Sequence, residues 1–289
     1  MVELTGILDK EHAEKLQKVK AAGIDIGSRA AKGVLLYNGR LYHKIVASGV
    51  SSIETGKQLL GVLRKEAGIQ EKDLEYIVGT GYGRVALEFD GVPFKGVTEI
   101  SCHALGAHFL NPNTRTIIDI GGQDSKAIKI SPTDGKVTDF IMNDKCAAGT
   151  GRFLEKVAQL LELELDELGE YAVRSDNPIE ISSQCVVFAE SEVVSLKAQG
   201  HSKEDIAAGI HKAAARRVQS LLRRTGFKQE VLFTGGVSNN NGMRKALEEV
   251  IDTKLGTTKL DTTLAGALGA AIHAAGFADE VRQSYGGGL

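Results

Sequence analysis

Short apolar runs that end in glycine alternate along this chain with longer segments of helical spacing. Residues 21–36 and 116–130 each have the pattern of an apolar strand, a tight glycine turn and a second strand. From Ser52 to Ala67 the apolar residues fall on one face of a helix. Further strands are predicted at 41–50 and 74–84, further helices at 9–20, 101–110, 149–163, 186–199, 203–225 and 264–276, and a strand, Gly-Gly turn and helix at 230–249. This alternation predicts an α/β fold.

The two predicted hairpins carry the same tripeptide, Asp-Ile-Gly, at Asp25–Gly27 and at Asp119–Gly121. Small residues in these turns, which are Gly27, Ser28, Gly121 and Gly122, let backbone N–H groups approach phosphate oxygens closely. We expect Asp25 and Asp119 to face each other across a cleft, where two carboxylates suit a hydrated Mg²⁺ ion. Each hairpin could instead be an ordinary turn with a capping aspartate, but the duplication favours two related half-molecules.

Length and composition agree with a two-domain protein that has a real core. The chain has 289 residues, of which 42% are hydrophobic, with 34 glycines and four prolines. A formal charge of −2 gives no electrostatic reason to expect nucleic acid or a membrane as a partner. No apolar stretch is long enough to span a bilayer and the first residues are too charged for a secretory signal, so we expect a cytoplasmic protein.

The order of the motifs resembles the actin, Hsp70 and sugar-kinase superfamily of ATPases from residue 21 to residue 275. The motifs are the two hairpins, a linking segment with Glu99, a Thr-Gly-Gly turn at 234–236 and a final helix of small residues at 264–276. This resemblance implies a two-domain actin-like ATPase, built from duplicated ribonuclease-H-like domains with a nucleotide cleft between them. The implied domains are 21–113 plus 264–289 and 114–263, preceded by an accessory helix at 1–20, with the boundary at residues 111–113.

The same resemblance implies a set of nucleotide-binding residues. Those assigned to the phosphates, the metal or water are Asp25, Gly27, Ser28, Arg29, Lys32, Gly121, Gly122, Gln123 and Asp124, and those assigned to adenosine are Gly235, Gly236 and Val237. Asp25 and Asp119 would hold Mg²⁺ through water.

Three residues are candidates for catalysis of ATP hydrolysis: Glu99, Asp119 and Gln123. Glu99 could orient or deprotonate the attacking water, as a similarly placed acidic residue does in the Hsp70 relatives. Glu99 could equally be a carboxylate that stabilises the start of a helix, and the sequence leaves both interpretations open. Gln123 is the other candidate for positioning water.

A narrower resemblance lies in four segments, 79–84, 99–107, 142–155 and 184–193, which are similar to the BadF/BadG/BcrA/BcrD family. Its best-known members activate 2-hydroxyacyl-CoA dehydratases. The resemblance implies a homodimer with one [4Fe-4S] cluster between the subunits, for which each chain supplies Cys146 and Cys185. Two thiolates per chain are doubled to four by a two-fold axis, and a cysteine before a helix is favoured as a thiolate.

The third cysteine, Cys102, is expected to be a thiol of the core. It lies within a predicted helix beside His103, with His108 further along, and this spacing makes a poor metal site. We therefore expect the two histidines to be surface or capped residues without a functional role.

Taken together, the resemblance implies an ATP-dependent one-electron donor that uses ATP, Mg²⁺ and a [4Fe-4S] cluster. It would take its electron from ferredoxin or flavodoxin and pass it to a partner metalloenzyme, such as a 2-hydroxyacyl-CoA dehydratase, a benzoyl-CoA reductase or a double-cubane cluster protein. Two alternatives remain on the same fold. One is a small-molecule kinase, which needs an acceptor pocket and usually an aspartate base in the first domain, and no convincing one is evident. The other is a chaperone-like or regulatory ATPase that works by conformation alone.

Overall fold

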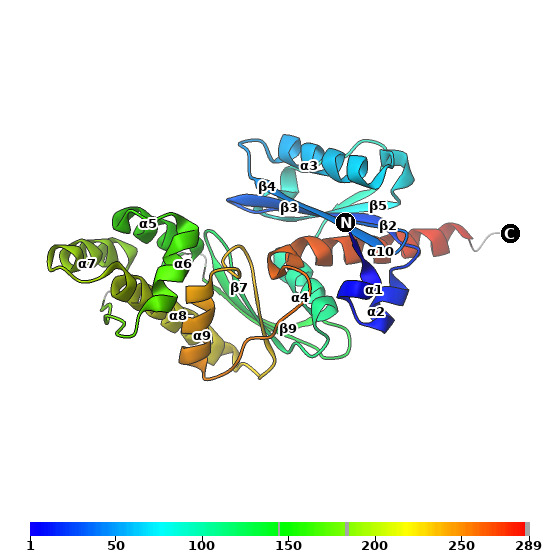
Figure 1. The fold of residues 1–289 in the computed structure, drawn as a ribbon. Coiled ribbons are helices and arrows are strands. Elements are labelled where there is room, and N and C mark those ends of the chain that lie inside the picture. The colour runs from blue at the N-terminus through cyan, green and yellow to red at the C-terminus, as the bar shows by residue number, and fades with distance from the viewer. Residues whose placement is uncertain (144, 183–184, 287–289) are drawn as a thin grey trace. The chain divides into compact units, whose positions relative to one another are not determined.

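A computed structural model describes residues 1–143, 145–182 and 185–286 of the chain (Figure 1). The chain divides into two compact units. Unit 1 comprises residues 1–113, 131–137 and 257–289, and unit 2 comprises residues 114–130 and 138–256. Asp144 and Gln184, which belong to the two cysteine-bearing segments of the sequence, lie outside the described residues.

Unit 1 is built on a six-stranded sheet with the strand order β1-β4-β3-β2-β5-β6. Strands β2, β3 and β4 form an antiparallel meander, and β5 adds to β2 in parallel. The strands are β1 (Val2–Glu3), β2 (Lys20–Ile26), β3 (Ala30–Tyr37), β4 (Arg40–Ala47), β5 (Tyr76–Gly81) and β6 (Phe94–Gly96).

Two cores cover the two faces of this sheet, as the alternation of buried residues along β2 requires. Ala22 and Ile24 belong to a core with Leu59 and Leu63 of α3. Ala21 belongs to the other core, with residues of α4, α10 and the N-terminal helices. Figure 1 shows α3 and α10 on opposite faces of the sheet. The helices are α1 (Leu4–Ile7), α2 (Lys10–Lys15), α3 (Ser52–Ala67), α4 (Glu99–Leu110) and α10 (Ala265–Gly286), with 3₁₀ turns at Glu71–Asp73, Tyr82–Ala86 and Thr262–Leu264.

Helices α4 and α10 pack backbone against backbone because small residues face each other. A Cβ atom at Gly106 of α4 would collide with the carbonyl of Ala265, and one at Gly269 of α10 would collide with the carbonyl of Cys102. This close packing confirms that the final segment of small residues is a helix packed tightly against another helix.

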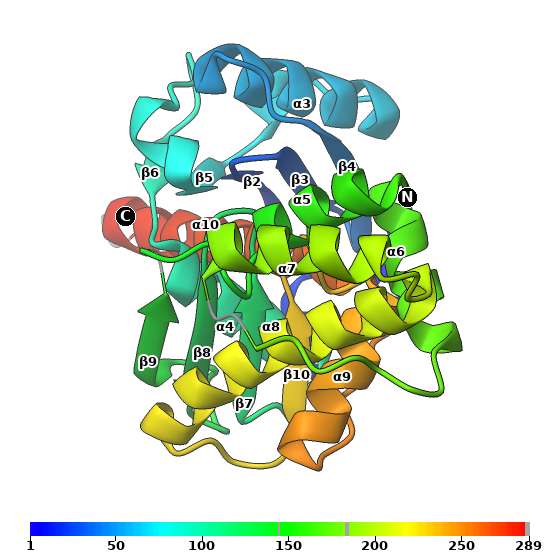
Figure 2. The same cartoon turned by 90° about the vertical axis from the view of Figure 1, so that its left-hand side faces the viewer.

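Unit 2 is built on a four-stranded sheet with the order β10-β7-β8-β9. Its strands are β7 (Thr116–Ile120), β8 (Ser125–Ile130), β9 (Val137–Asn143) and β10 (Val231–Thr234). One core joins the sheet to helices α5 (Gly151–Leu161), α6 (Leu165–Arg174), α7 (Val186–Ala198), α8 (Lys203–Thr225) and α9 (Asn241–Ile251). Figure 2 shows α8 running across the face of this sheet.

Most predicted elements are present, with some differences. Helices α3 and α8 have the predicted bounds. The predicted helix at 9–20 is wrong in its second half, since α2 ends at Lys15 and β2 begins at Lys20. The predicted start of α5 at Gly149 is also wrong, because Gly149 has φ +83° and the helix begins at Gly151. Among the described residues, no helix combines the length and apolar character that crossing a membrane requires.

Candidate nucleotide and cysteine sites

The Asp-Ile-Gly turn of unit 1 ends in a buried ion pair. Asp25, which is 2% exposed, lies opposite Lys32 on β3 and Thr80 on β5. Lys32 donates from Nζ to Asp25 Oδ2 at 3.3 Å. The turn is closed by the backbone N–H of Gly27, which donates to the carbonyl of Ala30 at 3.2 Å. A carboxylate and an ammonium group are thus fixed at the end of the strand beside a turn of small residues.

Unit 2 repeats this arrangement around its own Asp-Ile-Gly turn. Asp119, 1% exposed, lies opposite Lys126 on β8 and Thr234 on β10. Lys126 donates from Nζ to Asp119 Oδ2 at 3.0 Å, and Thr234 Oγ1 donates to Asp119 Oδ1 at 3.0 Å. The N–H of Gly121 donates to the carbonyl of Asp124 at 3.0 Å, as Gly27 does to Ala30.

The repeat extends to one glycine in each unit, which follows the threonine paired with the aspartate. Gly81 follows Thr80, and Gly235 follows Thr234. Gly81 has φ +79° and Gly235 has φ +89°, a region of backbone conformation that favours glycine. A Cβ at Gly81 would lie 2.6 Å from Asp25 Oδ1, and one at Gly235 would lie 2.6 Å from Asp119 Oδ1. The two units therefore hold equivalent sites, which we call the aspartate cradles. The sequence pattern identified the turns, but Lys126, Thr80 and Gly81 were not among the predicted site residues. Lys126 follows Asp119 by seven residues, as Lys32 follows Asp25, and this equal spacing could have indicated it.

The remaining residues predicted to bind phosphate or water lie in the two turns. Ser28 is half-buried and Arg29 exposed in the first turn, while Gly122 is half-buried and Gln123 exposed in the second. Asp124 differs, because it is buried and its Oδ2 lies 2.9 Å from Lys126 Nζ.

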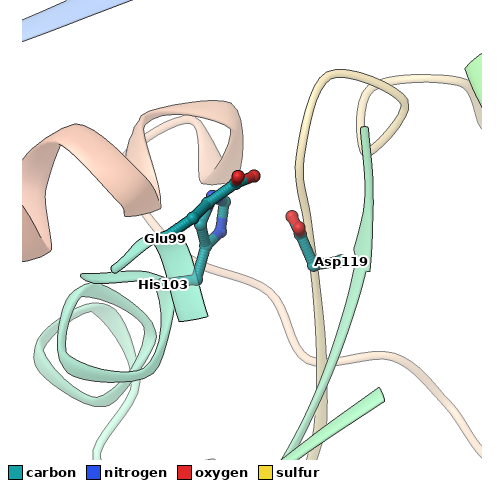
Figure 3. Close-up of side chains that lie close together, drawn as sticks. All are labelled: Glu99, His103 and Asp119. Carbon is teal, nitrogen blue, oxygen red and sulfur yellow. The ribbon is translucent and has the colours of Figure 1, made fainter. Parts of the chain in front are cut away.

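Glu99 is the first residue of α4, whose N-cap is Thr98 (Figure 3). Its carboxylate oxygen Oε1 lies 4.0 Å from Nε2 of His103, one turn further along the helix. A Cβ at Gly266 would lie 2.7 Å from His103 Nε2 and 3.1 Å from Asp25 Oδ2. In unit 1, therefore, the imidazole of His103 lies near two carboxylates, those of Asp25 and Glu99. Asp119, also drawn in Figure 3, comes from β7 of unit 2.

His103 and His108 are only 2% and 5% exposed, so the expectation that they are surface residues is wrong. Helix α4 is covered by α10 and by the N-terminal helices, and the ring of His108 contacts those of His12 and Phe109. The sequence did not show that the N-terminal segment covers this helix.

A cavity of about 480 Å³ in unit 2 includes Gly236 and Val237, two of the residues predicted to contact adenosine. Its wall is polar on one side, where Asn241 Nδ2 donates to Glu170 Oε1 at 2.8 Å. Other lining residues are Gly151, Leu154, Leu165, Asp166, Asn239 and Asn240.

Backbone hydrogen bonds connect this cavity to the second Asp-Ile-Gly turn. The N–H groups of Gly151 and Arg152 donate to the carbonyls of Gly121 and Gly122, both at 2.9 Å, and Val237 N–H donates to the carbonyl of Ile120 at 3.2 Å. The turn, the start of α5 and the loop after β10 thus form one rigid frame. The structure brings together Gly121, Gly122, Gly236 and Val237.

The three cysteines differ in accessibility. Cys102 is buried, and burial raises the pKa of its thiol to about 12. Cys146 is half-buried and Cys185 is exposed. Cys102 is therefore a thiol of the core, as expected, whereas the other two are accessible groups in unit 2.

A side chain holds two carbonyl groups of the loop at Cys146, and Cys185 lies at the start of a helix. Asn143 Nδ2 donates to the carbonyl of Cys146 at 2.8 Å and to that of Ala148 at 3.3 Å. Cys185 is the N-cap residue of α7, whose side chain caps no helix N–H group.

Comparison with known proteins identifies the family of the chain. The family model described as "BadF/BadG/BcrA/BcrD ATPase family" matches residues 22–274. The (R)-2-hydroxyglutaryl-CoA dehydratase activating ATPase of Acidaminococcus fermentans is 44% identical over 256 residues, which cover 87% of this chain and 95% of that protein.

Two solved structures have the same fold. The first is the crystal structure of the A. fermentans (R)-2-hydroxyglutaryl-CoA dehydratase component A, which has a TM-score of 0.85 and 43% identity and covers 91% of this chain and 100% of that one. The second is the activator of the 2-hydroxyisocaproyl-CoA dehydratase from Clostridium difficile with bound ADPNP, with a TM-score of 0.84, 43% identity and coverage of 91% and 97%. The actin-like α/β ATPase fold predicted from the sequence is confirmed, and the chain belongs to the BadF/BadG/BcrA/BcrD ATPase family.

Proposed function

We propose that this protein is an ATP-dependent one-electron donor that activates a partner metalloenzyme. The observation that carries the proposal is the combination, within unit 2, of an aspartate cradle with two accessible cysteines. An ATPase that worked by conformation alone would have no need for the cysteines. Relatives at 44–45% identity are named as activators of 2-hydroxyisocaproyl-CoA, (R)-2-hydroxyglutaryl-CoA and lactoyl-CoA dehydratases, which supports a partner of that class.

Nucleotide binding is assigned to the aspartate cradles and to the cavity beside Val237. The turns at Gly27–Arg29 and Gly121–Gln123 would offer backbone N–H groups to phosphate oxygens. Asp25 and Asp119 supply the carboxylate oxygens that a hydrated Mg²⁺ prefers. The cavity of about 480 Å³ has an apolar wall for a base and the Glu170–Asn241 pair for ribose hydroxyls. The relative from C. difficile, with ADPNP bound, supports ATP as the ligand.

We assign the positioning of the attacking water to Glu99 or Gln123. Glu99 is partly exposed and its carboxylate faces the imidazole of His103. A carboxylate held in this way can accept a proton from water or orient it. Gln123 is exposed in its turn, where its side chain is available to a ligand.

The residues around Cys146 and Cys185 fit an iron–sulfur cluster. Both thiols are accessible, and Cys185 lies at the N-terminus of α7. Two cysteines fill half of the four-thiolate shell of a [4Fe-4S] cluster, so a second copy of the chain would supply the other half. Such a cluster would hold the transferred electron at low potential.

A second copy is also supported by the surface that follows Cys185. Val187, Phe188 and Val194 of α7 are 67%, 68% and 52% exposed. An apolar helix face of this kind is typical of a protein interface. We propose that this face is covered in a homodimer, which would place the cysteines of both subunits together.

Anaerobic purification followed by iron analysis and absorbance spectroscopy tests the proposal. The expected result is a brown dimer with about four irons, whose broad absorbance decreases on reduction. Replacement of Cys146 or Cys185 by Ala should abolish the cluster, whereas Cys102→Ala, the matched control in the core, should retain it. A colourless dimer, or a cluster that survives Cys185→Ala, would overturn the electron-donor function.

A further inference from the structure

The surface of α8 is strongly basic although the whole chain is slightly acidic. Between residues 206 and 228 there are six lysines and arginines and no aspartate or glutamate, in a chain whose formal charge is −2. Two arginine pairs, Arg216–Arg217 and Arg223–Arg224, are seven residues apart. That separation is two helical turns, about 10.5 Å along the axis, so the pairs lie on the same side of the helix. We call Lys212 and these four arginines the basic face.

Most of the charge on this face is not neutralised by neighbouring acidic groups. Arg223 and Arg224 are exposed, and they have no ion-pair partner in the part of the chain that the structure describes. Arg216 contacts Glu180 at 3.2 Å, but these side chains are 49% and 78% exposed, so the pair is screened by water. The Nε atom of Arg217 is buried and makes no hydrogen bond to any described residue.

Basic residues are favoured at the C-terminal end of a helix even where no partner protein binds. Arg223 and Arg224 lie in the last turn of α8, where cations interact favourably with the helix dipole. That effect falls off within one turn, so it does not account for Arg216 and Arg217, which lie two turns earlier. The presence of Arg216 and Arg217 therefore needs another explanation.

The basic face borders the two segments that carry the accessible cysteines. A cavity of about 220 Å³ is lined by Arg216 and Arg217 of α8, by Ala148, two residues after Cys146, and by Ser182, three residues before Cys185. A Cβ at Gly149 would lie 3.3 Å from Cγ of Arg217, so the stem of this arginine packs against the loop after Cys146. Figure 2 shows α8 alongside α7, with the segment that follows α6 passing across α8.

We propose that the basic face is the docking surface for a small acidic electron-carrier protein. This inference rests on the proposed function and adds the place where the electron enters. The carrier is oxidised by one electron and the centre held by Cys146 and Cys185 is reduced by one, with no bond made or broken. Acidic carriers fit this face by charge complementarity, which accelerates and orients the encounter of two proteins.

The experiment measures the affinity of the anaerobically purified protein for an acidic ferredoxin, used as the probe, at low and high salt. The test variant is Arg223→Gln/Arg224→Gln, because both side chains are exposed. The matched control is Lys65→Gln/Lys72→Gln, which removes two exposed charges from unit 1. Lys65 also lies in the last turn of its helix, so the control reproduces the loss of a dipole interaction.

At low ionic strength the Arg223→Gln/Arg224→Gln variant should bind ferredoxin about tenfold more weakly than the unsubstituted protein, and the control should be unchanged. The difference should shrink at about 0.5 M salt, where charges are screened over a few ångströms. Equal affinity of the test variant, or an equal loss in the control, would overturn the docking surface. Cluster content and reduction by dithionite are measured separately: normal values with unchanged ferredoxin binding refute only the docking surface, whereas a missing cluster refutes the proposed function.

Discussion

Replacement of Lys126 by methionine should strongly destabilise unit 2. The side chain of Lys126 is 1% exposed, and its Nζ lies 3.0 Å from Asp119 Oδ2 and 2.9 Å from Asp124 Oδ2. Methionine has a similar length and fills the same space but carries no charge. The substitution therefore leaves two buried carboxylates without their shared counterion, in a region that water does not reach.

The size of the effect follows from the cost of an uncompensated buried charge. Removing one partner of a buried ion pair typically costs about 3–5 kcal/mol. For a protein of this size each kcal/mol lowers the melting temperature by about 2–4 °C, so the expected decrease is about 6–20 °C. Calorimetry on the metal-free and nucleotide-free protein measures it directly.

Two further variants separate the charge effect from a packing effect. Lys126→Met combined with Asp124→Asn removes one of the stranded charges and should recover part of the lost stability. Lys32→Met is the matched control in unit 1, where Lys32 Nζ lies 3.3 Å from Asp25 Oδ2 and the residue is 9% exposed. It should cost about half as much. A loss below about 1 kcal/mol for Lys126→Met, or no recovery in the double variant, would show that Lys126 is not the counterion of these carboxylates.

Three other outcomes are expected. A thiol reagent should label two cysteines of the cluster-free native protein and leave Cys102 unlabelled until the protein unfolds. Burial raises the pKa of Cys102 to about 12, so the thiol ionises at lower pH in the unfolded chain than in the folded protein. The contribution of Cys102 to stability should therefore be lost as the pH rises from about 9 to about 12. Gly235→Ala should cost about 1–3 kcal/mol because of its positive φ, whereas Gly236→Ala, whose Cβ would meet no atom within 4 Å, should cost less than 1 kcal/mol in urea unfolding. Val187→Asp/Phe188→Asp should convert the proposed dimer into a monomer in analytical ultracentrifugation, and a dimer that persists would exclude α7 as its interface.

The helices whose bounds were predicted best have capping residues at both ends. Helix α3 begins after Ser51, which caps it, and ends at Gly68 in the left-handed region, and α8 is bounded in the same way by Ser202 and Gly226. Strand β9 was missed because most of its residues are exposed on both faces, so it shows no alternation.

Those parts of the candidate site that are contiguous in the sequence could be predicted. The turns at 25–27 and 119–121 are visible as repeated tripeptides, but the partners of their aspartates lie on other strands. Thr234 contacts Asp119 across 115 positions of the sequence, and only the strand register brings them together. The burial of His103 likewise depends on α10 and the N-terminal helices, which no local pattern connects to α4.

The two aspartate cradles differ at the residue that accepts the turn hydrogen bond, and this difference separates the roles of their lysines. Ala30 and Asp124 accept equivalent turn hydrogen bonds, but only Asp124 adds a carboxylate. Lys126 Nζ lies within 3.0 Å of two carboxylates and the residue is 1% exposed, whereas Lys32 Nζ lies 3.3 Å from Asp25 Oδ2 and the residue is 9% exposed. A more exposed lysine with a longer ionic contact can turn toward a phosphate at a lower cost than a buried lysine that lies close to two carboxylates.

We therefore expect Lys32 to be the lysine that contacts the nucleotide and Lys126 to be structural. Lys32→Met should weaken ATP binding at least tenfold, the loss of about 1.4 kcal/mol, with a modest loss of stability. Lys126→Met, assayed well below its melting temperature, should bind ATP nearly as tightly as the unsubstituted protein. Fluorescence titration with a labelled ATP analogue measures both affinities. If Lys126→Met lost affinity for ATP and Lys32→Met kept it, the assignment would be reversed. Asp124 would then position Lys126 for contact with the nucleotide, and Lys32 would be structural.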